Sequence, residues 1–146
     1  RLKAAQSGSM RAQDAELNAV AGSAKLENAE NIRMLFHATS SLAWRNILRE
    51  GRMRCGKKGT CGPGIYWAAS PAEARNKAPN PQGVGTVIFC PVRLGRMKQI
   101  HDKEQHTLKQ LQLEGYDSIQ YQTETGVEFA IFDAEQVDVK QCLRVM

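Results

Sequence analysis

The stretch LFHATS, residues 35–40, closes a short apolar run on a histidine, and GPGIYW, residues 62–67, places a tyrosine after a glycine-rich turn. The run RMLFHA predicts a buried strand that ends near His37. The sequence SSLAWRNILREG, which follows this run, predicts a helix that a serine caps and that Gly51 ends. His37 is therefore expected at a strand-to-helix junction, where a side chain can face a cleft.

A basic, glycine-rich segment separates this helix from the tyrosine. Residues 52–64 contain four glycines and a proline, which predicts a loop. Its positive charges are Arg52, Arg54, Lys57 and Lys58. Such a loop suits an anionic ligand, and a solvated loop without a ligand is an equal alternative. A short strand, IYWAA, follows, and SPAEARNKA, residues 70–78, carries the capping pattern of a helix start.

The remaining segments complete an α+β pattern. Residues 12–28 are rich in alanine and predict an outer helix, after a linker-like segment at 4–10. Residues 102–115 suggest a helical connection. Strands are expected at 86–94, 118–122, 128–133 and 137–146, where β-branched and aromatic residues gather between turn residues. The sequence thus predicts helices early in the chain, followed mostly by antiparallel strands.

Size and charge fit one compact domain with an anionic partner. The chain has 146 residues, a net charge of +5 and an isoelectric point near 9.2. This charge favours a nucleotide, a nucleic acid or an acidic surface, and a solvated basic face is an equally good explanation. No apolar run has the length of a membrane span, so no membrane association is expected.

The four cysteines predict no metal site. They are Cys55, Cys61, Cys90 and Cys142. The five-residue gap between the first two is not a usual zinc spacing, and no nearby histidine completes a ligand set. Free, at least partly buried thiols are therefore expected, which favours a reducing compartment. Localisation is accordingly expected to be intracellular, in the cytoplasm or nucleus, with a delivered toxin or effector as the alternative.

Four segments in order resemble a known enzyme family. They are NIRMLFHATS, GPGIYWA, VIFCPVRLGR and EFAIFDAEQVDVKQCLRV. Together they resemble the catalytic domain of the poly(ADP-ribose) polymerase (PARP) family, the diphtheria-toxin-type ADP-ribosyltransferases with a His-Tyr-Glu triad. The resemblance covers about residues 29–146, and it leaves 1–28 as a linker and helix. It implies two packed, mostly antiparallel sheets with flanking helices and an NAD cleft.

The resemblance also implies a set of site residues. His37 is expected to hydrogen-bond ribose hydroxyls, and Tyr66 to stack on the nicotinamide ring. Glu128 is expected beneath the nicotinamide ribose, where a carboxylate favours developing positive charge and orients or deprotonates an acceptor. These three are the implied catalytic residues. The implied NAD-binding residues are His37, Ala38, Thr39, Gly64 and Tyr66, with the Ala38 backbone clamping the nicotinamide amide.

Two positions depart from the family pattern. The family usually has a serine that binds the amide and a second tyrosine that closes the ring sandwich. Counting along the chain places Ala74 and Lys77 at these positions. Neither residue can do the same work, so weaker binding of the nicotinamide ring is expected. The region 102–125 is expected to be the acceptor-side loop between the last strands.

The leading hypothesis is an ADP-ribosyltransferase, a glycosyltransferase in reaction class, that uses NAD as co-substrate and no metal. Its acceptor is expected to be a protein, with a nucleic acid as the alternative, and the chain is expected to be a monomer. A tRNA 2′-phosphotransferase-like enzyme is a second hypothesis, because that class shares the fold and the start of the first motif. A non-catalytic module that binds ADP-ribose or a nucleotide is a third, and Ala74 and Lys77 favour it.

Overall fold

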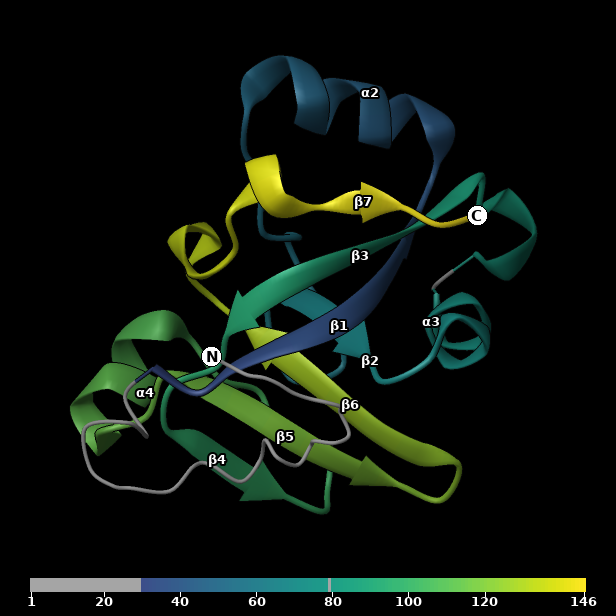
Figure 1. The fold of residues 1–146 in the computed structure, drawn as a ribbon. Coiled ribbons are helices and arrows are strands. Elements are labelled where there is room, and N and C mark those ends of the chain that lie inside the picture. The colour runs from purple at the N-terminus through teal and green to yellow at the C-terminus, as the bar shows by residue number, and fades with distance from the viewer. Residues whose placement is uncertain (1–29, 79) are drawn as a thin grey trace. The chain divides into compact units, whose positions relative to one another are not determined.

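The computed structural model describes residues 30–78 and 80–146, so the helix predicted at 12–28 and the linker predicted at 4–10 lie outside the described residues. Residues from Ile32 to Met146 form one compact unit (Figure 1). Its strands are β1 (Ile32–Thr39), β2 (Ile65–Ala68), β3 (Thr86–Arg93), β4 (Met97–Ile100), β5 (Ser118–Thr123), β6 (Gly126–Ile131) and β7 (Leu143–Arg144). Its α-helices are α2 (Ser41–Glu50), α3 (Pro71–Lys77) and α4 (Leu108–Glu114), and short 3-10 turns occupy Pro81–Gly83, Ala134–Gln136 and Val139–Gln141.

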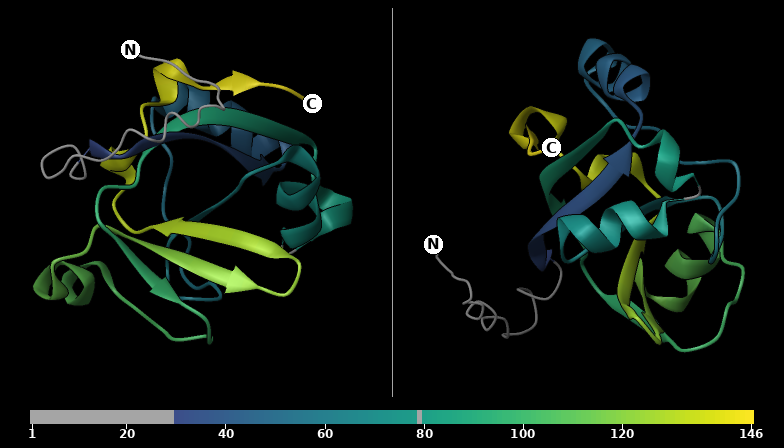
Figure 2. Two further views of the ribbon diagram at one scale, coloured as in Figure 1. Left: turned by 60° about the horizontal axis from the view of Figure 1, so that its bottom comes forward. Right: turned by 90° about the vertical axis from the view of Figure 1, so that its right-hand side faces the viewer.

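All the described strands belong to one mixed sheet. Their order is β4-β5-β6-β2-β1-β3-β7, and only β4 and β5 run parallel. The pairing of β1 with β2 has a single residue pair in register, Phe36 with Ala68, so the sheet nearly divides there. In Figure 2, β1, β3 and β7 lie on one side of the molecule and β4, β5 and β6 on the other. The family resemblance implied two sheets. The structure has one seven-stranded sheet instead, and its two halves are joined only by the single pair between β1 and β2.

Local sequence signals set the ends of α2 and α3. The Ser40 hydroxyl accepts a hydrogen bond from the backbone N–H of Ala43, and Gly51 ends α2 in the left-handed conformation. Ser70 caps α3 by accepting from the backbone N–H of Glu73, with a proline at the first turn. The predicted start of each helix is therefore confirmed, and two residues separate α3 from the end of β2.

Three apolar clusters stabilise this arrangement. The largest lies around Trp67 and joins β1, β2, β3 and β6. A second, around Ile119, holds α4 against β5 and β6. A third, small cluster packs α3 through Ala74 on Ala68 and Val87. The site-bearing ends of β1, β2 and β6 are thus positioned by buried packing on both faces of the sheet.

Three segments differ from the sequence-based expectation. The region 102–125 is more ordered than the acceptor-side loop expected there, because it contains α4 and β5, which confirm the helical connection predicted at 102–115 and the strand predicted at 118–122. The segment 97–100, for which no strand was expected, forms β4 and pairs with β5. The strand expected at 137–146 is reduced to Leu143–Arg144, because the Asp138 side chain accepts from the backbone N–H of Lys140 and starts a 3-10 turn.

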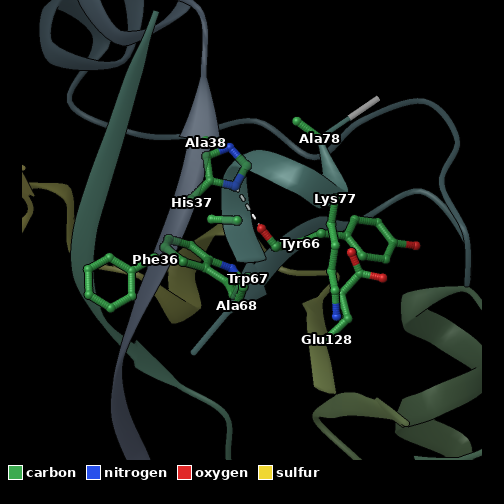
Figure 3. Close-up of a pocket in the computed structure, with 10 residues that line it drawn as sticks. Phe36, His37, Ala38, Tyr66, Trp67, Ala68, Lys77, Ala78 and Glu128 are labelled. Carbon is green, nitrogen blue, oxygen red and sulfur yellow. Dashed lines mark hydrogen bonds between the residues drawn. The ribbon is translucent and has the colours of Figure 1, made fainter. Parts of the chain in front are cut away.

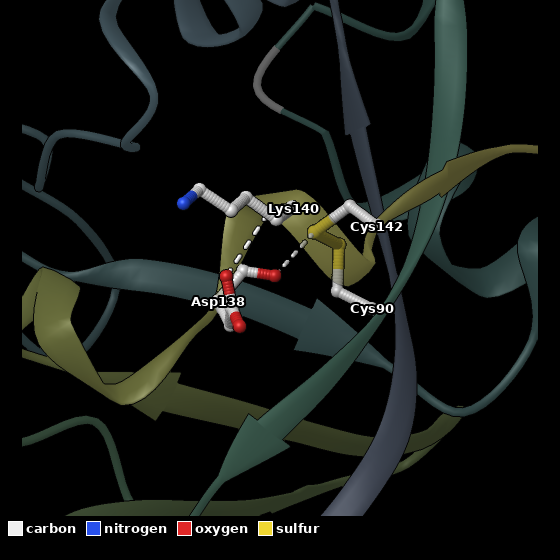
Figure 4. The surroundings of a disulfide bond; sticks show 4 residues. All are labelled: Cys90, Asp138, Lys140 and Cys142. Carbon is white, nitrogen blue, oxygen red and sulfur yellow. Dashed lines mark hydrogen bonds between the residues drawn. A yellow bond between two sulfur atoms is a disulfide. The ribbon is translucent and has the colours of Figure 1, made fainter.

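A disulfide joins Cys90 of β3 to Cys142, next to β7 (Figure 4). The expectation of free thiols is therefore wrong for this pair, whereas Cys55 and Cys61 are free. Both bonded cysteines lie in apolar surroundings, and the pairing of Phe89 with Leu143 brings them next to each other. The cysteines thus no longer support a reducing compartment. In the described part of the chain, every helix is too short or too polar to cross a membrane.

Candidate active site

One pocket brings together side chains from four parts of the fold. His37 comes from β1, Tyr66 from β2, Lys77 from the end of α3 and Glu128 from β6 (Figure 3). Its volume is about 50 Å³, which is room for a few water molecules. The other lining residues are Phe36, Ala38, Trp67, Ala68, Ala74 and Ala78. The three residues of the predicted triad therefore line a single pocket, together with a lysine.

The His37 imidazole is tied to the neighbouring strand. Its Nδ1 atom lies 2.7 Å from the backbone oxygen of Tyr66, and because a carbonyl oxygen only accepts, Nδ1 carries the proton in this bond. Burial lowers the pKa of His37, and this hydrogen bond only partly opposes the effect. The ring is therefore neutral near pH 7, and its Nε2 atom keeps a lone pair that can accept from a ligand hydroxyl.

Tyr66 is fixed by its hydroxyl as well as by its backbone. The hydroxyl donates to the backbone oxygen of Gly62 at 2.6 Å and accepts from the backbone N–H of Cys61 at 2.8 Å. Burial raises the pKa of Tyr66 to about 12, so it stays a neutral phenol. A Cβ atom at Gly59 would lie 2.5 Å from the Tyr66 ring, so the glycine lets the loop close around it. The ring is thus held in one place before any ligand binds.

Glu128 and Lys77 supply the charges of the pocket. Burial raises the pKa of Glu128, and the positive charge of Lys77 opposes this rise. In the sheet, Glu128 lies opposite Ala68 of β2 and Tyr121 of β5. Among the described residues, two buried side-chain nitrogens have no hydrogen-bond partner, Trp67 Nε1 and Lys77 Nζ, and both residues line this pocket. The pocket therefore contains one carboxyl group and unused hydrogen-bond donors.

The face of α3 that covers this pocket carries the two departures from the family pattern. Ala74 and Lys77 lie one turn apart on α3, Ala78 follows the end of the helix, and all three line the pocket. Ala74 is buried and offers no hydrogen bond. Lys77 extends past Tyr66 toward Glu128 in Figure 3. Where the family usually has a serine and a tyrosine, this pocket thus has the methyl group of Ala74 and the ammonium of Lys77.

A second pocket, of about 270 Å³, shares His37 with the first. Its other lining residues are Thr39, Ala43, Asn46, Ile47, Glu50, Arg52, Met53 and Arg54. Arg54 is largely exposed and donates through Nε to the Glu50 carboxylate at 2.9 Å, which lowers the pKa of Glu50. Arg52 is exposed as well. The guanidinium groups of Arg52 and Arg54 both lie at the wall of this pocket. Such a wall suits a phosphate-bearing ligand.

The model of one protein family matches nearly the whole sequence. Residues 11–145 match the family described as the Poly(ADP-ribose) polymerase catalytic domain. The chain belongs to this family. No curated protein matches the chain. Membership confirms the PARP resemblance inferred from the four motifs, and it implies ADP-ribosyltransferase chemistry, for which NAD is the substrate of the family's domain.

The NAD-binding residues that the PARP resemblance implied do not all lie in one pocket. His37, Ala38 and Tyr66 line the first pocket, and Thr39 lines the second. Gly64 lines neither pocket. A Cβ atom there would lie 2.7 Å from the backbone oxygen of Ile131, so close packing against β6 accounts for this glycine.

Sequence reasoning missed the contribution of α2 to the second pocket. Ala43, Asn46, Ile47 and Glu50 all line the second pocket. Their spacing of three and four residues places them on one face of a helix that starts directly after the histidine motif. The polar residues at two of these positions were the available signal. In residues 30–78 and 80–146, no group of three or more His, Cys, Asp or Glu side chains is arranged to hold a metal ion.

Proposed function

We propose that this chain is an NAD-dependent ADP-ribosyltransferase that releases nicotinamide and transfers ADP-ribose to a protein acceptor. The observation that carries the proposal is the placement of His37, Tyr66 and Glu128, from three different strands, on the wall of one pocket. The neutral imidazole of His37 supports it, because its Nε2 atom can accept from a ribose hydroxyl. Membership of the PARP catalytic domain family supports the same chemistry.

The two pockets fit the two halves of a dinucleotide differently. The larger pocket, with Arg52 and Arg54 at its wall, has the charge to bind a diphosphate and the room for a nucleoside. The smaller pocket has the aromatic ring of Tyr66 on which a nicotinamide ring can stack. Its volume of about 50 Å³ leaves room for only part of that ring, so side chains that line it must shift when NAD binds.

In the proposed reaction, the bond between the ribose carbon C1′ and the pyridinium nitrogen breaks. Its electron pair leaves with the nicotinamide, which becomes neutral. The positive charge that develops on the ribose is stabilised by the nearby Glu128 carboxylate. An oxygen of the acceptor then bonds to C1′, and an acceptor hydroxyl passes its proton to Glu128 or to water. His37 holds a ribose hydroxyl throughout, which keeps C1′ aligned with the acceptor.

A non-catalytic module that binds ADP-ribose or a nucleotide is the second candidate. The observation that favours it is Lys77, whose ammonium lies in the small pocket where the nicotinamide ring is proposed to bind. The larger pocket could still bind an adenine nucleotide when the smaller one rejects the ring. Such a module would bind ADP-ribose at least as tightly as NAD and would release no nicotinamide.

The two candidates are separated by incubating the protein with NAD that is isotopically labelled in both the nicotinamide and the adenosine. An ADP-ribosyltransferase releases labelled nicotinamide and transfers the adenosine label to protein, which intact-mass spectrometry detects. The Glu128→Gln variant is the matched control, because it keeps the size of the side chain and removes its charge. Binding of NAD without any nicotinamide release by the unmodified protein would contradict the proposed enzyme and support the module.

A further inference from the structure

The ammonium group of Lys77 is a charged group of the small pocket that the proposed reaction does not use. Its Nζ atom is buried, and it has no hydrogen-bond partner and no ion pair within the described part of the chain. An ammonium removed from water in this way is costly unless an opposite charge lies close by. The structure must therefore offset this charge within the pocket or its immediate surroundings.

Glu128 is the only carboxylate among the residues that line this pocket. Its side chain lies next to that of Lys77 in Figure 3, and the two come from different elements, β6 and α3. A second carboxylate, Glu73 of α3, also lies near this ammonium: the Ser70 hydroxyl lies 3.2 Å from its Oε1, whereas its Oε2 and Lys77 Nζ both lie next to Gly126. Glu128 is thus the carboxylate of the pocket wall on which the Lys77 charge acts, at more than 4.0 Å, with Glu73 outside the wall as a second neighbour of the ammonium.

We propose that Lys77 is the counter-ion of Glu128, a positioning residue that keeps this carboxyl group ionised and turned into the pocket. The role of Lys77 in transfer rests on the proposed function, whereas its pairing with Glu128 does not. The position is suited to this work because Ser70 caps α3 and Ala74 packs the helix on the sheet. The ammonium is therefore delivered from a fixed helix rather than from a loop.

Burial and Lys77 act on Glu128 in opposite directions. Burial raises the pKa of this carboxyl group, and the Lys77 charge lowers it. Replacing Lys77 by an uncharged residue removes the lowering effect, so Glu128 should take up a proton at a higher pH. Activity that needs the carboxylate should then be lost at a higher pH as the solution is made acidic.

Other titratable groups surround Glu128 and must be distinguished from it. They are His37 of β1, Cys61 of the glycine-rich loop, Tyr66 of β2, Glu73 and Lys77 of α3, and Tyr121 of β5. The phenol of Tyr66 and the thiol of Cys61 have pKa values raised to about 12 and about 11, so they stay protonated in the acidic range. His37 gives no carboxyl signal, and the Glu73 signal persists in Glu128→Gln, so neither is mistaken for the signal that this variant removes.

The test is a carbon-13 NMR titration of the glutamate carboxyl groups in the protein without ligand. The Glu128 signal is assigned as the one missing from Glu128→Gln. Lys77→Met should move its titration midpoint to higher pH, whereas Lys77→Arg, which keeps the charge, should leave it closer to the original value. Lys109→Met is the control, because it removes one exposed positive charge from α4. A midpoint that Lys77→Met moves no more than Lys109→Met does would overturn the proposal.

Nicotinamide release from NAD at a series of pH values then tests the role in transfer. The acid limb of the rate profile should shift to higher pH in Lys77→Met and return toward its original position in Lys77→Arg, with thermal unfolding confirming that each variant is folded. A moved NMR midpoint with no NAD cleavage by the unmodified protein would uphold the pairing and overturn the role in transfer together with the proposed function. An unmoved midpoint in a protein that cleaves NAD would overturn the pairing alone.

Discussion

The Nδ1 atom of His37 hydrogen-bonds to the backbone oxygen of Tyr66 at 2.7 Å, so two residues of the proposed triad are joined directly. This bond crosses the weakest part of the sheet, where β1 and β2 have a single residue pair in register. It fixes the tautomer of the imidazole and leaves Nε2 as an acceptor. The placement of His37 therefore depends on the tyrosine segment, and the two motifs act as one unit.

The stability of the protein should depend on pH through His37. Its pKa in the folded state is lowered from 6.5, so below this pH the unfolded chain binds a proton that the folded chain does not. The free energy of unfolding should consequently fall as the pH drops from about 7.5 to about 5.5. In His37→Gln this decrease should be smaller, as measured by urea unfolding at each pH. An equal or steeper decrease in the variant would contradict the lowered pKa.

Replacing Tyr66 with phenylalanine should destabilise the glycine-rich loop. The change leaves the Gly62 carbonyl and the Cys61 N–H without the hydroxyl to which each is bonded. A lost partner of this kind costs about 1–3 kcal/mol in unfolding free energy. Tyr116→Phe is the control, because the Tyr116 hydroxyl makes no hydrogen bond among the described residues. Equal unfolding free energies for the two variants would show that the Tyr66 hydroxyl does not hold the loop.

The diphosphate of NAD is predicted to bind near Arg52. Arg52→Ala should weaken NAD binding by roughly tenfold, because a hydrogen bond to a charged group contributes about 1.5–3 kcal/mol. Calorimetry or fluorescence titration measures the affinity, which should also become less sensitive to salt. Arg96→Ala removes an exposed arginine that lies outside both pockets and should have no effect. Equal losses in the two variants would indicate a general effect of charge instead.

The Cys90–Cys142 disulfide can be tested without any assay of enzyme activity. Thiol labelling of the unfolded, unreduced protein should count two free cysteines, Cys55 and Cys61, and labelling after reduction should count four. In the folded protein Cys61 should react slowly, because burial raises its pKa to about 11. Cys142→Ser should lower the free energy of unfolding by about 2–4 kcal/mol. Four reactive thiols before reduction would show that Cys90 and Cys142 are not bonded.

Much of this fold could be predicted from local signals. The serine and proline at the start of α3, and Gly51 at the end of α2, act within a few residues and are visible in the sequence. By contrast, β4 is only four residues long and depends on its partner strand β5 for its structure. The Cys90–Cys142 bond spans 52 residues, and its cysteines become neighbours only through the pairing of β3 with β7. Non-local pairing of this kind leaves no local signal.

The residues of the candidate site also divide into those that local motifs predict and those that depend on non-local packing. His37, Tyr66 and Glu128 could be chosen from short motifs, and the structure places them on one pocket wall, although their roles stay predictions. Lys77 was selected only as a position at which the family tyrosine is absent. That its ammonium is buried beside Glu128 depends on how α3 packs on β1, which the sequence of the helix alone does not determine.

The most direct test of the account is the kinetics of Glu128→Gln, with nicotinamide release and NAD affinity measured on the same samples. A carboxylate that stabilises the transition state should affect turnover far more than substrate binding. We predict a decrease in the rate of nicotinamide release of about a hundredfold to a thousandfold, with NAD affinity and thermal stability nearly unchanged. A variant that releases nicotinamide as fast as the unmodified protein would remove Glu128 from the mechanism and contradict the proposed transferase.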